Sequence, residues 1–413
     1  MSEIDYRHNK SNGINIKFST LIISVIFLLL LLGTLNATFT SLSNLGLFAL
    51  SLTTGMGIFF LIVHYSVSKK IHKTHFLIIS ISIAFLSVSL IGFFGNVQKS
   101  GLINLIQFLL CIGFAIFLSS IKWDRYKILT LGKFASAFIL IHFFIWASTG
   151  FESAFSSIYA NPNLIGPYML FMLFFIIWAR RHSNYKFFYN ITFIFGFLTM
   201  LGSDARSALL SGLIGFTTYL SWKFLTKNKF QFSLFILIVL SALLAFVFVY
   251  SRLPEWEHFL YFENLMLQYT GKSLMSGRQF LWGPILPIIG EHPWFGHGPG
   301  VTAGDVLFVN HSLHNLYLQI TLQNGYLGIS IFMMLLFTIW MTFWVARKDK
   351  TVKLVGTFFI AILVHQSFEI TLTQNQLSIG LMQWFIISIG ISQALHHPKQ
   401  TSDNQLKSPH TLR

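Results

Sequence analysis

Long apolar stretches separated by short polar breaks run along almost the whole chain. Most of them approach the roughly 20 residues that an α-helix needs to cross a bilayer. Twelve stretches are recognised, at 18–35, 45–66, 74–94, 102–120, 128–147, 162–179, 187–201, 207–222, 230–250, 316–345, 352–369 and 377–395. The pattern predicts an all-α polytopic membrane protein of about 12 transmembrane helices. The stretch from Leu316 is longer than one span requires, and Gly325 is its expected break.

The two ends of the chain need separate interpretations. Lys17 precedes the first apolar stretch, which therefore resembles a signal peptide. That stretch is long for the apolar part of a signal peptide, and the cleavage site is poor, so we expect a retained first span. Residues 1–395 are then the integral membrane domain. Residues 396–413 are poor in apolar side chains and are predicted to form a disordered polar tail in the cytoplasm.

Composition and charge support a membrane protein. Hydrophobic residues make up 54% of the chain and charged residues 10%, whereas soluble domains are about 25% charged. The net charge of +15 lies in short runs between the apolar stretches, which is typical of the positive-inside distribution and does not require a nucleic-acid partner. With a cytoplasmic N-terminus, five basic residues fall on the outer face: Lys99, Arg206, Arg252, Lys272 and Arg278. The distribution predicts a cell-membrane protein with both termini in the cytoplasm. The single cysteine, Cys111, excludes an intramolecular disulfide and a cysteine-based metal site.

One connection is far longer than the others. Residues 251–313 form a single predicted loop on the outer face, whereas most connections in compact proteins have a few residues. Within it, the stretch 255–269 can form an amphipathic helix at the membrane interface. Two roles stay open for this helix, namely covering the top of the bundle and contacting a substrate.

The first candidate for chemistry is an arginine that departs from the charge pattern. Arg206 lies in the sequence GSDARS (202–207), at the outer N-terminus of a predicted span. A cation is unfavourable at a helix N-terminus unless an anion is bound there. Such an anion would contact both the helix amides and a bidentate guanidinium, which favours an anion site. The alternatives are a snorkelling side chain and a pair with Asp204.

A second candidate lies inside the long loop. Arg278 and Trp282 belong to the sequence GRQFLW (277–282) and share a helix face because they are four residues apart. A guanidinium suits phosphate, and an indole ring suits a sugar. The sequence GEHPWFGHGPG (290–300) is dense in glycine and proline and indicates a shaped turn. The alternative is that Trp282 and Trp294 are interfacial belt residues.

The third candidate stands where the long loop re-enters the membrane. His314 is a plausible general base at neutral pH, and Asn315 follows it. His311 and His314 are three residues apart and could instead bind a metal, although no third ligand stands nearby in a motif. A structural histidine is a further alternative. Glu369, at the outer end of the span 352–369, could orient a histidine, contact an acceptor sugar, or simply be a solvated helix terminus.

Several classes of protein are not indicated. The chain has no P-loop, and it has no Asp-x-Asp pair on the predicted cytoplasmic side. These absences argue against an ATP-driven pump and a metal-dependent nucleotide-sugar transferase. Few charges lie inside the spans, and no internal repeat is found. Both observations weaken the alternative of a transporter or flippase of lipid-linked sugars.

In this order and placement, the motifs resemble the O-antigen ligase and polymerase family of bacterial membrane glycosyltransferases. The resemblance covers about residues 190–345 and departs from the family at Ala205, where members often have serine. The matching elements are Ala205-Arg206, Gly277-Arg278 with Trp282, Pro293 to Gly300, and His314-Asn315 through Gly328.

This resemblance implies a GT-C-like fold and a metal-independent transferase without a cofactor. Its donor would be an undecaprenyl-diphosphate-linked oligosaccharide in the lipid bilayer. Arg206 and Arg278 match the family's diphosphate-binding arginines, and His314 matches its catalytic histidine. We expect Glu369 to assist catalysis, and Trp282 and Asn315 to bind substrate.

The acceptor distinguishes the activities within this family. The richness in Ile, Phe, Lys, Asn and Ser hints at an AT-rich genome, as in a bacterium without an outer membrane. Such a cell has no lipid A acceptor. We therefore predict an inverting polymerase of capsular or exopolysaccharide repeat units, acting on a growing polysaccharide. Transfer to another lipid or to a protein stays open as the alternative.

Overall fold

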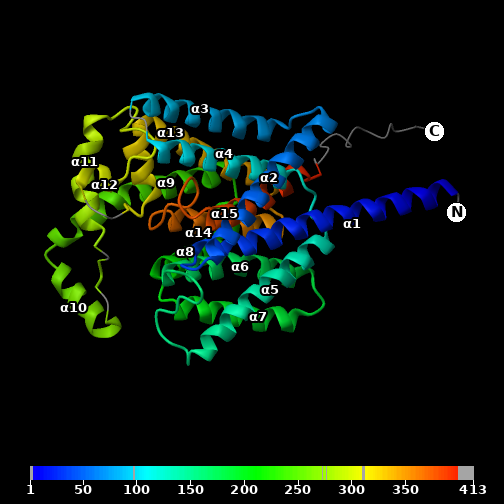
Figure 1. Cartoon of the computed structure of the whole chain (residues 1–413), viewed down its shortest axis with the longest axis horizontal. Helices are drawn as coiled ribbons and strands as arrows, with labels where there is room; N and C mark the ends of the chain where they lie inside the picture. The colour runs from blue at the N-terminus through cyan, green and yellow to red at the C-terminus, as the bar shows by residue number, and fades with distance from the viewer. Residues whose placement is uncertain (1–2, 96–97, 272, 276, 309–311, 399–413) are drawn as a thin grey trace, which may run out of the picture.

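The computed structural model describes residues 3–95, 98–271, 273–275, 277–308 and 312–398. Within these residues every regular element is a helix (Figure 1). Lys272, His311 and residues 399–413 of the predicted tail lie outside the described residues.

Each of the twelve predicted stretches corresponds to one helix, and eleven of them agree with it to within four residues at each end. The exception is the first stretch, 18–35, because its helix already begins at Glu3. These helices are α1 (Glu3–Leu32), α2 (Leu42–Ser68), α3 (Lys73–Gly95), α4 (Lys99–Ser119), α5 (Arg125–Ser148), α6 (Pro162–His182), α7 (Lys186–Gly202), α8 (Arg206–Leu225), α9 (Lys229–Arg252), α13 (Leu316–Phe343), α14 (Lys350–His365) and α15 (Leu377–Leu395). Three more α-helices lie in the long loop, namely α10 (Phe259–Thr270), α11 (Gln279–Glu291) and α12 (Ala303–Leu307). Short 3-10 turns follow three of the long helices, at η1 (Gly33–Ala37), η2 (Leu253–Glu255) and η3 (Trp344–Ala346).

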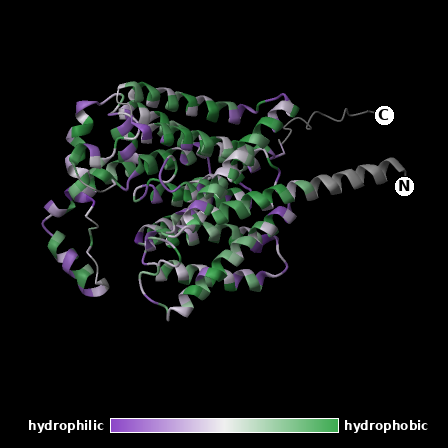
Figure 2. Cartoon of the chain, in the orientation of Figure 1, coloured by the Kyte–Doolittle hydropathy of each residue, from purple (hydrophilic) through white to green (hydrophobic). Residues whose placement is uncertain are grey.

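The helices are apolar along their length, and hydrophilic residues gather mainly near their ends and in the connections (Figure 2). Among the described residues, nine helical segments are long and apolar enough to cross a membrane, and α7 is a shorter apolar helix. The prediction of an all-α polytopic membrane protein is therefore confirmed. The number of spans, twelve, stays a prediction.

Phenylalanine rings join the central helices. The ring of Phe385 in α15 contacts rings from three other helices, with centroid distances of 5.5 Å to Phe27, 6.1 Å to Phe114 and 5.4 Å to Phe175. These partners belong to α1, α4 and α6, and all four residues are 0% exposed. Edge-to-face ring pairs add to the packing energy of the buried area. Phe27 therefore packs α1 into this core, and retention of the first span stays a prediction.

The helix α13 is broken at the predicted position. Gly325 has φ 64° and ψ −167°, which interrupts the helical backbone. A Cβ atom at Gly325 would lie 2.4 Å from the backbone of Trp294, so only glycine fits there. The amide of Tyr326 donates to the carbonyl of Pro293 at 2.7 Å, and His297 donates to Leu322 at 2.8 Å. The glycine-rich turn after α11 therefore packs into the break and holds it open.

The helix predicted in the long loop is present and projects from the bundle. It begins after η2 as α10 and lies at the lower left of Figure 1, below α11 and α12. We call the end of the bundle that carries these three helices the loop end. Seven large apolar or aromatic side chains of this segment are exposed: Trp256, Leu260, Tyr261, Phe262, Leu265, Leu267 and Tyr269.

The orientation of the bundle can be tested by cysteine labelling of whole cells. In a Cys111→Ala background, Glu291→Cys is expected to react with a membrane-impermeant thiol reagent in intact cells, because the loop end is predicted to face outward. Lys227→Cys, in the connection between α8 and α9, should react only after lysis. Labelling in the reverse order would place the loop end, and the site described below, in the cytoplasm.

Candidate functional site

The candidate site begins at the N-terminus of α13. Asn315 caps this helix, since its side-chain oxygen accepts a hydrogen bond from the amide of Leu318 at 3.0 Å. The Asn315 amide group donates to the carbonyl of Ser367 at 3.2 Å. His314 precedes the cap with φ 47°, a left-handed conformation that few residues other than glycine adopt. The backbone therefore turns sharply at His314, immediately before it enters the helix.

The imidazole of His314 meets the carboxylate of Glu369. Nδ1 of His314 lies 3.1 Å from Oε2 of Glu369, with the two side chains 46% and 22% exposed. An acceptor on Nδ1 favours the tautomer that carries a proton there, which leaves Nε2 as the basic nitrogen. A carboxylate in this position also stabilises an imidazolium. The pair can therefore take up a proton at Nε2.

The carboxylate of Glu369 is carried by an irregular, buried segment. The helix α14 ends at His365, four residues before the predicted end of that span. The following connection, 366–376, turns back into the protein before α15 begins. Several of its polar side chains are at least 94% buried: Gln366, Ser367, Thr371, Thr373 and Gln374. Glu369 is thus held by a packed loop and not by a solvated helix terminus.

Arg278 lies beside this segment. It is the residue immediately before α11, and one guanidinium nitrogen donates to the carbonyl of Phe368 at 3.1 Å. The guanidinium carbon also lies 5.6 Å from the centroid of the Phe368 ring. Burial lowers the pKa of Arg278 from its ordinary value, and the nearby carboxylate of Glu369 opposes this effect. A partly desolvated cation therefore stands next to the His314–Glu369 pair.

Arg206 completes the positive charge of the site. It is the first residue of α8, and its guanidinium donates to the carbonyl of Ser273 at 2.7 Å. Its charge contributes to lowering the pKa of Arg278, so the two guanidinium groups lie within electrostatic range. The carboxylate of Asp204 accepts a hydrogen bond from the amide of Ala154 at 3.2 Å. The N-terminus of α8 and both arginines together form a region suited to an anion.

Residues 191–333 match the family model described as O-antigen ligase. Over this segment the chain is similar to O-antigen ligases. The match runs from α7 into α13 and covers about a third of the chain, so the resemblance predicted from the sequence is confirmed over this part. A comparison with curated proteins finds no match. Arg206, Arg278 and His314 lie within the matched residues 191–333. Glu369 lies outside them and is brought to His314 by the fold of the chain.

Two of the predicted substrate-binding residues, Trp282 and Asn315, are buried. Trp282 is 0% exposed, and its indole nitrogen donates to the carbonyl of Leu313 at 2.8 Å. Asn315 is also 0% exposed and caps α13. In this structure neither side chain offers a surface to a sugar, because each one supports the backbone on one side of His314. Direct contact of either residue with substrate stays a prediction.

The support given by Trp282 can be measured. Trp282→Phe keeps an aromatic ring but leaves the buried carbonyl of Leu313 without its donor, which is expected to cost about 1–3 kcal/mol of stability. Thermal unfolding of the purified protein in detergent should show a lower melting temperature. Trp294→Phe is the control, because Trp294 is 62% exposed and its substitution should change little. Equal melting temperatures for both variants would contradict the proposed role of the Trp282 hydrogen bond.

Sequence reasoning missed two contributors to the candidate site. The ring of Tyr250, at the end of α9, lies 4.9 Å from that of Trp282, and Tyr250 also raises the pKa of Arg278. Gln366 organises the segment that carries Glu369, through contacts described below. A run of Gln, Ser and Thr between two apolar spans could have indicated the role of Gln366. Nothing in the sequence near Tyr250 indicates that this residue contributes to the site.

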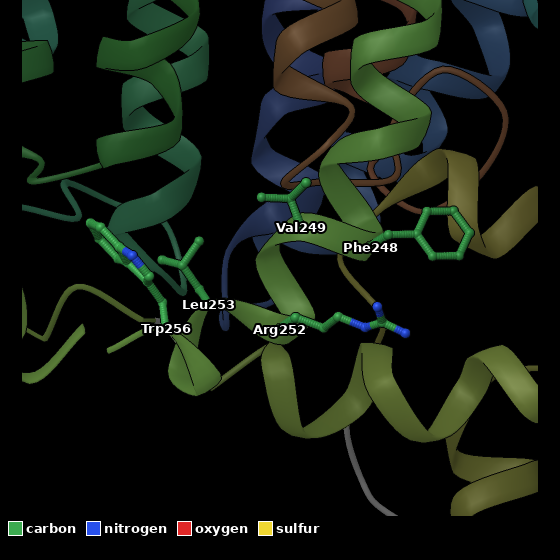
Figure 3. Close-up of a pocket in the computed structure, with 5 residues that line it drawn as sticks. All are labelled: Phe248, Val249, Arg252, Leu253 and Trp256. Atoms are coloured by element: carbon green, nitrogen blue, oxygen red, sulfur yellow. The ribbon is translucent and has the colours of Figure 1, made fainter. Parts of the chain in front are cut away.

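An apolar pocket of the structure is lined by none of the predicted site residues. It has a volume of about 460 Å³ at the loop end of α9 (Figure 3). Its lining residues are Phe248, Val249, Arg252, Leu253 and Trp256. Among the described residues, no group of three or more His, Cys, Asp or Glu is arranged to hold a metal ion, and His311 of the alternative metal pair is not among them.

Proposed function

We propose that this protein is a glycosyltransferase that polymerises undecaprenyl-diphosphate-linked oligosaccharide units into a capsular polysaccharide or exopolysaccharide on the outer face of the cell membrane. The family match supports an activity like that of O-antigen ligases and polymerases. The observation that carries the proposal is the hydrogen bond between His314 and Glu369 beside the half-buried Arg278. This contact supports the proposal, because an imidazole held by a carboxylate suits a general base and guanidinium groups suit an anion.

The two arginines would act on the leaving group. Transfer of a sugar from a polyprenyl diphosphate breaks the bond between the anomeric carbon and a phosphate oxygen, and negative charge then collects on the diphosphate. Arg206 and Arg278 would bind this diphosphate through forked hydrogen bonds, assisted by the N-terminal amides of α8. Their interaction strengthens as the charge develops, which is the condition for catalysis.

The histidine would act on the acceptor. Nε2 of His314 would take the proton from an acceptor hydroxyl while the hydroxyl oxygen attacks the anomeric carbon. Glu369 would hold the ring and stabilise the imidazolium that forms. Attack from the side opposite the diphosphate inverts the configuration of the anomeric carbon. No metal or cofactor is required by these steps.

Deletion of the gene separates the proposed polymerase from its alternatives. A polymerase mutant should accumulate single lipid-linked repeat units on the outer face and lose long surface polysaccharide, and both should be restored by the intact gene. Accumulation of long lipid-linked chains would indicate a ligase instead. Accumulation of single units on the cytoplasmic face would indicate a flippase and would overturn the proposed function.

A further inference from the structure

Four consecutive residues of the connection between α14 and α15 each provide one group to the site. The carbonyl of Gln366 accepts from the amide of Leu316 at 2.8 Å, at the start of α13. The carbonyls of the next two residues accept from the side chains of Asn315 and Arg278. The carboxylate of Glu369 contacts His314. The position of this short stretch therefore fixes the relative positions of the proposed base and the proposed diphosphate ligand.

The stretch has no regular secondary structure, and a single side chain closes it. Oε1 of Gln366 accepts from the backbone amides of Thr371 and Leu372, at 3.0 and 3.1 Å. Its Nε2 donates to the hydroxyl of Thr371 at 2.9 Å and to Oε1 of Gln383 at 3.2 Å. Both Gln366 and Gln383 are 0% exposed. The carboxamide thus satisfies amides that would otherwise be buried without partners, and it anchors the loop to α15.

We propose that Gln366 is a positioning residue for sugar transfer, because its carboxamide closes the loop 366–372 and thereby holds Glu369 against His314. The proposal rests on the proposed function of the site. Gln366 itself would touch neither donor nor acceptor. Small displacements of catalytic groups are costly, and a misplacement of about 1 Å can lower a rate by about 100-fold.

Hydrogen exchange tests the loop without any assay of activity. Gln366→Met keeps an unbranched side chain of similar length but removes both hydrogen-bonding groups. We expect faster exchange of the amides in a peptide covering residues 366–376. Tyr168→Phe is the matched control, because it removes another buried hydrogen bond, the one between the hydroxyls of Tyr168 and Ser378 at 2.6 Å, which lies outside the closed loop. Unchanged exchange in Gln366→Met would overturn the proposal.

A double-mutant cycle tests whether the loop acts through Glu369. Per unit of folded protein, Gln366→Met should lower the transfer rate by up to about 100-fold in the parent enzyme. In a Glu369→Ala background the same change should lower the rate far less, because the side chain that Gln366 positions is then absent. An equal loss in both backgrounds would show a general structural effect and would overturn the positioning role.

Two further outcomes stay distinguishable. If Gln366→Met does not accumulate in membranes, Gln383→Met takes its place in both experiments. That variant removes the anchor on α15 but leaves the bonds from Gln366 to the amides of Thr371 and Leu372. We therefore expect a smaller rise in exchange and a smaller loss of transfer rate. An equal loss of rate with and without Glu369 would again overturn the positioning role. If the parent protein transfers no sugar, the proposed function fails, and the exchange result then decides separately whether Gln366 closes the loop.

Discussion

Replacing His314 with alanine is expected to lower the rate of sugar transfer by a factor of about 10² to 10⁴, which is the usual contribution of a general base. The acceptor hydroxyl would then lose its proton to water or to a poorly placed group. Binding of the lipid-linked donor should persist, since the two arginines that would bind the diphosphate are unchanged. The variant should therefore carry single lipid-linked units and form no long chains.

The matched variant for this prediction is Glu369→Gln. It keeps the size of the side chain and a hydrogen-bond acceptor for Nδ1 of His314, but it removes the charge that stabilises the imidazolium. We expect a smaller loss of rate than for His314→Ala, with unchanged donor binding. Wild-type chain lengths in His314→Ala protein of normal abundance would remove His314 from the mechanism.

Replacing Arg278 with lysine is expected to lower the transfer rate by about 10²- to 10³-fold, the range seen when one preorganised donor to a developing charge is lost. The guanidinium can donate to Phe368 and retain donors for a diphosphate, whereas an ammonium group is a compact point charge without that fork. Purified Arg278→Lys should show a lower maximal rate in a transfer assay.

Arg252→Lys is the control for this substitution. Arg252 lies at the same end of the bundle, where it lines the apolar pocket beside Trp256, but it has no proposed role in catalysis. Its replacement should leave the transfer rate within about twofold, as for a surface substitution. Equal activity of Arg278→Lys and the parent protein would contradict a diphosphate-binding role for Arg278.

The membrane helices and the break in α13 could be predicted because both depend on local sequence. A run of apolar residues crosses a bilayer whatever its neighbours are, so hydropathy alone places the helices to within a few residues. Gly325 was predicted because it interrupts an apolar stretch that is too long for one span. The reason that glycine is needed there, the close approach of Trp294, depends on a turn about thirty residues away and was not predictable.

The support of the site was harder to predict because it depends on contacts between distant residues. Arg206, Arg278 and His314 were recognised from short motifs and from their charge or chemistry. The burial of Trp282 depends on packing against Tyr250 and on the carbonyl of Leu313, and its sequence neighbourhood fits a sugar-stacking or interfacial residue equally well. Glu369 was expected at a helix end, whereas hydrogen bonds from Gln366 fold that segment into a buried loop.

The central claim is that the protein breaks the bond between a sugar and undecaprenyl diphosphate and forms a new bond between sugars. The most direct test uses purified protein in lipid vesicles that contain the lipid-linked repeat unit and a metal chelator. Free undecaprenyl diphosphate and glycosidic bonds are measured over time. The account predicts that they appear in equal amounts, and that His314→Ala lowers the rate of appearance of both by a factor of about 10² to 10⁴. Movement of the lipid-linked unit across the vesicle membrane without release of undecaprenyl diphosphate would contradict it.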